Sequence, residues 1–264
     1  MRSPPAWSVL RGEATVFLFG VRPGARDSGW VTESIRAAVL TCDEFWRETP
    51  PEDEITSNPL LAELGLSHDI PLSERLDEAT LKRLEVVGEA LSIDRHVLEP
   101  FRPWVAAQIV QQGALERAGV PPDQNMDVVL KQLAEEHGAT IRYEFDVDGI
   151  LRMFAELPES MEMDYLQLIL DAAEGGPDLI TEGFSAWLRG DRSLDELGDT
   201  NWRQRYPSLY GPLIRERNQA WVPRIDDMLR RPGTRFVAVG CGHLAGEDSV
   251  VALLEQIDCR IVPQ

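Results

Sequence analysis

Two short apolar runs near opposite ends of the chain constrain its fold most. "ATVFLFG" (14–20) and "RFVAVG" (235–240) are aliphatic and aromatic and end in glycine, which is typical of buried strands. Each is followed by a stretch with helical spacing, over 30–42 and 247–257, and then by a second strand-like run, over 43–48 and 259–263. Strand, helix, strand units of this kind favour parallel strands joined by a right-handed crossover.

The middle of the chain is mostly helical in pattern. Only "ATIRYEF" (139–145) alternates like a strand, and no low-complexity linker divides the sequence. We therefore predict an α/β fold with a central mixed β-sheet built from the N- and C-terminal units, and an all-helical insert that forms a lid. In this prediction residues 1–264 are a single domain, with the sheet from about 10–50, 139–146 and 233–264 and the insert over about 60–230. Helical spacing is present over 78–93, 103–119, 125–138 and 161–176.

Composition narrows the classes of partner. The 264 residues carry a formal charge of −19, so attraction to nucleic acid or to an anionic membrane surface is opposed by the overall field. Two prolines stand where the apolar core of a signal peptide would begin, and no run approaches the roughly 18 apolar residues of a membrane span. We expect a soluble, cytoplasmic protein; homo-oligomer formation stays open. The three cysteines lack CxxC spacing, which favours free thiols.

Candidate functional residues follow the predicted strands. In open α/β sheets, ligands bind beyond the carboxyl ends of the strands. The residues expected there are Arg22 after the first strand, Glu48 after the second, Glu144 after the middle strand and His243 after the C-terminal strand. His243 has three open interpretations, which are a metal ligand, a general base and a hydrogen-bonded structural group.

Arg217 is the second informative residue. It lies one helical turn before Trp221, on an apolar face, so its guanidinium is expected to point to the interior. A buried arginine needs a carboxylate, and Glu48 or Glu144 could supply it. A structural ion pair without a catalytic role is the alternative.

Longer stretches of the sequence resemble a known family. "WSVLRGEATVFLFGVRPG" and "RERNQAWVPRIDDMLRRPGTRFVAVGCGHLAGEDSV" are similar to the TraB/GumN family, whose relatives include the Tiki metalloproteases and, more remotely, the erythromycin-esterase and ChaN-like proteins. The resemblance spans nearly the whole chain. It implies a hydrolase that acts on a peptide or another amide or ester bond.

The resemblance also implies which residues carry the chemistry. Its second Gly-x-x-His motif falls on His243, its glutamate on Glu48 and its arginine on Arg217. The first motif departs from the family pattern, because Pro23 stands where a histidine is expected after Gly20. A second departure follows the middle strand, where Gly149 replaces the usual glutamine although Glu144 is retained.

Three functional alternatives follow from this resemblance. In the first, Glu48 and His243 bind a divalent metal (Mn, Zn or Mg) that activates water. In the second, they act without metal as a general base pair and Arg217 stabilises developing charge. Arg22, Glu144 and Asn218 are expected to contact the substrate, and Arg22 would suit an anionic ligand. The third alternative is a catalytically inactive member that binds a small molecule or peptide in the same cleft.

Overall fold

The computed structural model describes residues 4–23, 30–121 and 125–264. The chain forms two compact units. The first contains residues 1–48, 123–144 and 182–264, and the second contains residues 49–122 and 145–181.

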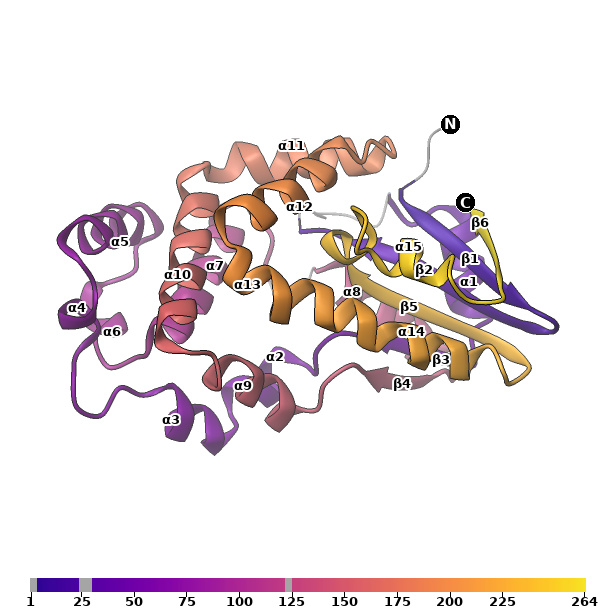
Figure 1. Cartoon of the computed structure of the whole chain (residues 1–264), viewed down its shortest axis with the longest axis horizontal. Coiled ribbons are helices and arrows are strands. Elements are labelled where there is room, and N and C mark those ends of the chain that lie inside the picture. Colours follow the sequence, from indigo (N-terminus) through magenta and orange to yellow (C-terminus); the bar gives the residue numbers. More distant parts are fainter. Residues whose placement is uncertain (1–3, 24–29, 122–124) are drawn as a thin grey trace. The chain divides into compact units, whose positions relative to one another are not determined.

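The first unit is built on a six-stranded mixed sheet with the order β4-β3-β5-β2-β1-β6 (Figure 1). β5 is parallel to both β2 and β3, β3 is parallel to β4, and β1 is antiparallel to β2 and β6. The predicted α/β fold and mixed sheet are therefore confirmed. The strands are β1 (Ala6–Arg11), β2 (Ala14–Val21), β3 (Glu44–Arg47), β4 (Thr140–Tyr143), β5 (Gly233–Gly240) and β6 (Arg260–Pro263).

The two ends of the chain lie side by side in this sheet. β5 pairs with β2 in a register that places Val21 opposite Gly240. β1 was not predicted; it forms a hairpin with β2, and the turn contains Gly12 at φ 57°. Because β1 covers the other edge of β2, β6 pairs with β1 and not with its sequence neighbour β5.

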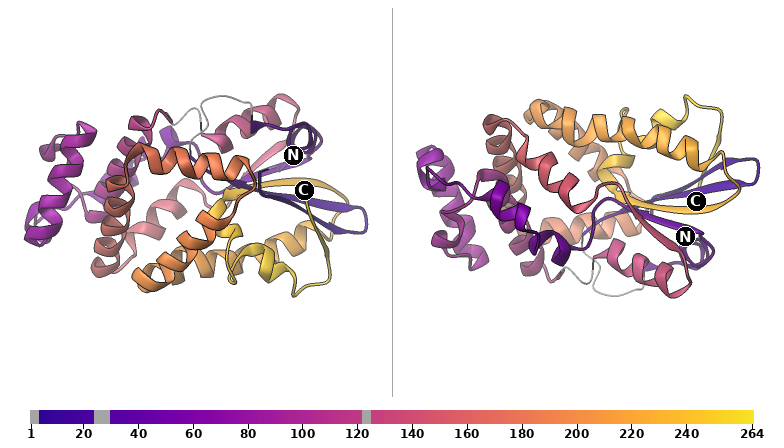
Figure 2. Two further views of the ribbon diagram at one scale, coloured as in Figure 1. Left: turned by 90° about the horizontal axis from the view of Figure 1, so that it is seen from above. Right: turned by 90° about the horizontal axis from the view of Figure 1, so that it is seen from below.

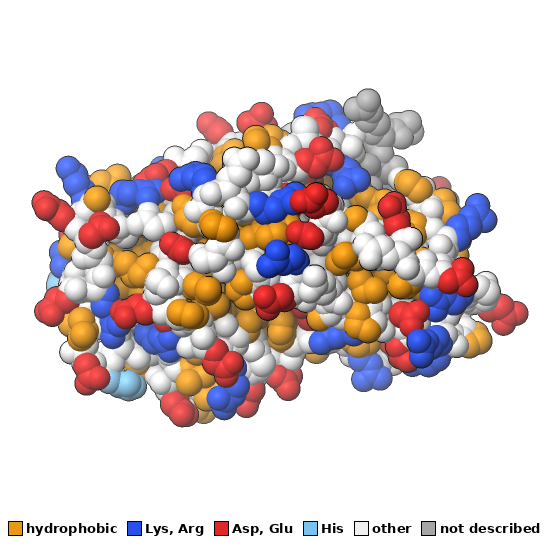
Figure 3. All heavy atoms as spheres, in the orientation of Figure 1, with side chains coloured by type: hydrophobic (Ala, Val, Ile, Leu, Met, Phe, Trp, Pro, Cys, Tyr) orange, Lys and Arg blue, Asp and Glu red, His pale blue; other side chains and the backbone are white. Residues whose placement is uncertain are grey.

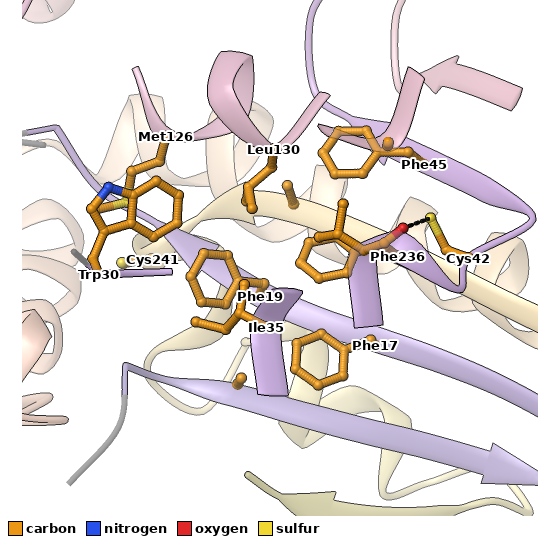
Figure 4. Packing of buried hydrophobic residues seen from close by; sticks show 14 of the residues in the cluster. Phe17, Phe19, Trp30, Ile35, Cys42, Phe45, Met126, Leu130, Phe236 and Cys241 are labelled. Carbon is orange, nitrogen blue, oxygen red and sulfur yellow. Dashed lines mark hydrogen bonds between the residues drawn. The ribbon is translucent and has the colours of Figure 1, made fainter. Parts of the chain in front are cut away.

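Side chains alternate between the two faces of the sheet. Phe17, Phe19, Phe45 and Phe236 gather on one face (Figure 4), where α1 (Glu33–Leu40) and α8 (Met126–Glu136) contribute to the same buried cluster. On the other face, Val16, Leu18, Val237 and Val239 pack with residues of α14 (Glu216–Met228) and α15 (Val250–Leu254). Figure 2 shows helices on both faces, which explains why β2 and β5 are almost continuously apolar.

α14 (Glu216–Met228) is the end of a longer helical segment. It follows α13 (Pro207–Tyr210) through a π-helical turn over Gly211–Arg215. Pro223 therefore lies inside the helix and not at its start. Because proline has no N–H, the helix loses one internal hydrogen bond there. α11 (Gly176–Leu188) and α12 (Ser193–Arg205) were not predicted.

The C-terminal helix is shorter than predicted. A 3₁₀ turn over Cys241–Leu244 and Gly246, at φ 82°, follow β5, and α15 then spans only Val250–Leu254. Ser249 caps it, because its Oγ accepts a hydrogen bond from the N–H of Ala252 at 3.2 Å. The sequence predicts a helix that begins at Glu247. In the structure Glu247 and Asp248 precede the helix.

The second unit is helical. Its described residues contain no strand, only an isolated bridge between Leu66 and Phe101. The helices of this unit are α2 (Glu52–Thr56), α3 (Pro59–Gly65), α4 (Leu72–Arg75), α5 (Glu78–Leu91), α6 (Arg95–Leu98), α7 (Pro103–Arg117), α9 (Val147–Ala155) and α10 (Glu159–Glu174).

Across the described part of the chain, no helix combines the length and apolarity needed to cross a bilayer. Figure 3 shows acidic and basic side chains interspersed over the visible face.

Candidate functional site

Three neighbouring parallel strands of the first unit deliver polar groups at their carboxyl ends. Glu48 follows β3, Glu144 follows β4, and the 3₁₀ turn that carries His243 follows β5. β3 and β4 are paired with Arg47 opposite Tyr143, so the next residue of each strand is a glutamate. Residues far apart in the sequence therefore meet at one edge of the sheet.

Arg217 of α14 joins the two glutamates. Its Nε and Nη2 donate to the two carboxylate oxygens of Glu144 at 3.0 and 2.6 Å, and Nη2 also donates to Oε2 of Glu48 at 2.7 Å. The side chain of Glu144 is only 3% exposed and that of Arg217 14%. The predicted ion pair is therefore present, with both candidate carboxylates. One guanidinium faces two carboxylates, which leaves this trio with one net negative charge.

Glu48 is held in its ionised form. Burial alone would raise its pKa, but the charge of Arg217, with hydrogen bonds from Arg217 and from the Gly240 N–H, lowers the pKa to about 2. The Gly240 N–H lies 2.5 Å from Oε1. Sequence reasoning missed this donor, because every residue except proline carries a backbone N–H and no residue type marks the one that binds Glu48.

His243 is buried and neutral near pH 7. Burial lowers its pKa to about 4, and the positive charge of Arg217 acts in the same direction against the smaller effect of Glu48. Its Nδ1 lies 2.6 Å from Oδ1 of Asn218, and its Nε2 lies 3.6 Å from Oε2 of Glu48. Asn218 in turn donates from Nδ2 to the backbone carbonyl of Asp248 at 2.9 Å. The structure thus brings together five of the six predicted site residues, which are Glu48, Glu144, Arg217, Asn218 and His243.

Arg22, the sixth, has a different set of partners. Its guanidinium forms an ion pair with Asp195 at the start of α12. It also lies against the backbone of α11 at Gly183, where a Cβ would approach Arg22 Nε to 2.6 Å. Burial raises the pKa of Asp195 despite the opposing charge of Arg22. Burial also raises the pKa of the Cys241 thiol. The structure therefore places Arg22 in an ion pair that ties the loop after β2 to two helices.

A second buried ion pair was also missed. Nη2 of Arg47, the residue before Glu48, lies 2.7 Å from Oδ2 of Asp127 at the start of α8. Arg47 is 6% exposed, and burial and the charge of Glu48 raise the pKa of Asp127 against the effect of Arg47. Because α8 and α14 cover opposite faces, Arg47 and Glu48 anchor the end of β3 on both sides.

The described side chains do not offer the three-ligand set of a catalytic zinc site. Among the residues that the structure describes, no three His, Cys, Asp or Glu side chains are grouped as metal ligands. Two atoms that could bind a metal, His243 Nε2 and Glu48 Oε2, lie 3.6 Å apart. Both carboxylate oxygens of Glu144 are already bound to Arg217. Catalytic zinc sites use three protein ligands. Pro23, exposed two residues beyond β2, supplies none.

Comparison with known proteins identifies a family. The model of the TraB/PrgY/gumN family matches residues 5–263, which is nearly the whole chain. No curated protein and no solved structure matches significantly.

Proposed function

We propose that this chain, which belongs to the TraB/PrgY/gumN family, is a hydrolase of a peptide bond or of another amide or ester bond. The observation that supports this most directly is that His243 Nε2 and Glu48 Oε2 lie 3.6 Å apart. A neutral imidazole beside an ionised carboxylate is suited to hold a water molecule and to take a proton from it.

The proposed reaction uses these two side chains in sequence. Water donates hydrogen bonds to Nε2 and Oε2, and loses a proton to the imidazole as its oxygen attacks the carbonyl carbon of the substrate. The carboxylate of Glu48 stabilises the imidazolium that forms. The imidazolium then gives its proton to the leaving nitrogen or oxygen as the scissile bond breaks. Arg217 keeps Glu48 ionised and fixed, and no step passes through a metal.

A second function is favoured by the contacts of Arg217. Its guanidinium already donates to two carboxylates, so its charge is compensated before any substrate is bound. Stabilisation of an oxyanion by this residue would require it to leave one of them. A member that binds a small molecule or peptide without turnover is therefore the alternative.

Activity measurements separate these functions. Protein purified without chelator is assayed on a panel of amide and ester substrates, with and without EDTA, as wild type and as His243→Ala and Glu48→Gln. We expect hydrolysis that survives EDTA and falls at least about 100-fold in His243→Ala, the low end for loss of a general base. A wild-type protein that is inert on the panel supports binding without turnover. Stoichiometric metal that is lost in His243→Ala would assign the metal-dependent mechanism instead.

A further inference from the structure

We propose that Asn218 is a positioning residue that fixes the protonation pattern of the His243 ring. The inference deepens the proposed hydrolytic function and rests on it for its consequence, though its geometry does not depend on it. Asn218 is 1% exposed and lies on α14, directly after Arg217. Its amide contacts His243 Nδ1 and the backbone carbonyl of Asp248, so it acts on His243 and not on a substrate.

The orientation of the Asn218 amide is determined by a backbone carbonyl. The carbonyl of Asp248 can only accept a hydrogen bond, so the amide atom 2.9 Å from it is the donor Nδ2. The atom that faces His243 is then Oδ1, which can only accept. Because Oδ1 lies 2.6 Å from His243 Nδ1, the ring must carry a proton on Nδ1.

This proton has a consequence on the other side of the ring. A neutral imidazole has one N–H, so Nε2 carries a lone pair directed at the Glu48 carboxylate, 3.6 Å away. Without Asn218, the negative charge of Glu48 would favour the opposite tautomer, with the proton on Nε2. That tautomer would pair His243 with Glu48 directly and would remove the base. Asn218 therefore keeps two acceptors facing each other, which a water molecule can join by donating to both.

The acceptor that orients Asn218 is itself held in place. The hydroxyl of Tyr210 lies 3.2 Å from the carboxylate of Asp248 and 2.9 Å from that of Asp199. Asp199 is buried and also pairs with Arg203, which in turn pairs with Glu247. A hydrogen bond to the Asp248 side chain and an ion pair of the preceding residue, Glu247, thus help to fix the carbonyl that Asn218 uses.

Nitrogen NMR of the imidazole rings tests the assignment without reference to activity. Protein labelled with ¹⁵N-histidine is examined at pH 7.5 by long-range ¹H–¹⁵N correlation, as wild type, Asn218→Leu and Asn218→Asp, with His243→Gln to assign the signal. We expect a protonated, pyrrole-type Nδ1 and an unprotonated, pyridine-type Nε2 in the wild type. Asn218→Leu should exchange the two types. Asn218→Asp, which still offers an acceptor to Nδ1, should keep the wild-type pattern.

The outcomes separate the two proposals. A wild-type spectrum with the proton on Nε2 overturns the role of Asn218, whatever the variants do, and so does an unchanged pattern in folded Asn218→Leu. The expected spectra without hydrolysis of any substrate would leave the role of Asn218 intact and reject the proposed function. Where hydrolysis is present, Asn218→Leu should lower kcat by 10-fold or more with little change in KM, and Asn218→Asp should restore part of it.

Discussion

Arg217 binds Glu144 through two separate N–H groups, with Nε 3.0 Å from Oε1 and Nη2 2.6 Å from Oε2. This forked geometry is specific to a guanidinium, because an ammonium group has a single nitrogen and cannot present two parallel N–H bonds. The same Nη2 reaches Glu48, so one side chain of α14 joins the ends of β3 and β4.

Removal of this guanidinium should be costly. Arg217→Met leaves two neighbouring carboxylates without a counter-charge, and we expect a loss of about 3–5 kcal/mol in the free energy of unfolding, typical of a broken buried ion pair. Urea denaturation at pH 7 measures it. Arg215→Met, at an exposed position two residues earlier, is the matched control and should change stability by less than about 0.5 kcal/mol. Equal effects of both substitutions would contradict the role assigned to Arg217.

The stability of the fold should fall with acid through His243. Its pKa is about 4 in the folded state, below the ordinary value of 6.5, so the unfolded chain binds the proton first. This contribution is complete above pH 6.5 and is lost as the pH falls from 6.5 to 4, by about 3 kcal/mol in total. Denaturation of the wild type at pH 7.5 and pH 4.5, compared with His243→Gln, measures it. His137→Gln removes an exposed histidine and should keep the wild-type pH dependence.

Two glycines of neighbouring helices should respond to alanine in opposite directions. Gly183→Ala places a methyl group where the Arg22 guanidinium lies, which should weaken its ion pair with Asp195 and cost about 1–3 kcal/mol. Gly198→Ala adds a methyl group to α12 with nothing within 4 Å, and should stabilise the protein by about 0.5–1 kcal/mol. Thermal or urea unfolding of both variants checks the pair. A neutral Gly183→Ala would show that Arg22 moves aside without loss.

Pro23→His should increase the affinity of the site for a divalent metal. β2 and β5 pair with Val21 opposite Gly240, so residue 23 lies beyond β2 on the side where the His243 turn leaves β5. Pro23→His would add a third donor to Nε2 of His243 and Oε2 of Glu48. We expect calorimetry with Zn²⁺ or Mn²⁺ to show binding at least 10-fold tighter than in the wild type, and the gain to disappear in Pro23→His/His243→Ala. Unchanged affinity would mean that residue 23 does not face this site.

The sequence predicted the parts of the fold that follow from strong apolar patterns. β2 and β5 were identified because both faces of each strand are buried, which requires an almost continuous apolar run. β1 was not predicted, because it lies nearer the sheet edge, Ser8 interrupts its apolar residues and Arg11 ends it. α12 was missed because it is polar: its buried residues are the carboxylates Asp195 and Asp199, which no hydrophobic pattern marks. The lid expected of the helical insert stays a prediction.

The sequence predicted which residues make up the candidate site better than it predicted the contacts between them. Strand order brings Glu48, Glu144 and His243 to one edge, and the apolar face of α14 turns Arg217 towards them. The hydrogen bond from the Gly240 N–H and the orientation of Asn218 by a backbone carbonyl could not be read from residue types, because they depend on backbone positions. The same holds for the π-helical turn that precedes Arg217.

The position of β5 between β2 and β3 sets the order in which the sheet can be completed during synthesis. β2 and β3 have no ladder with each other, and the strand that separates them is synthesised after more than 230 other residues. Until then the hairpin of β1 and β2 presents an open apolar edge, which a nascent chain must shield. Chaperone dependence of folding should therefore concentrate in the interval before residue 240 emerges.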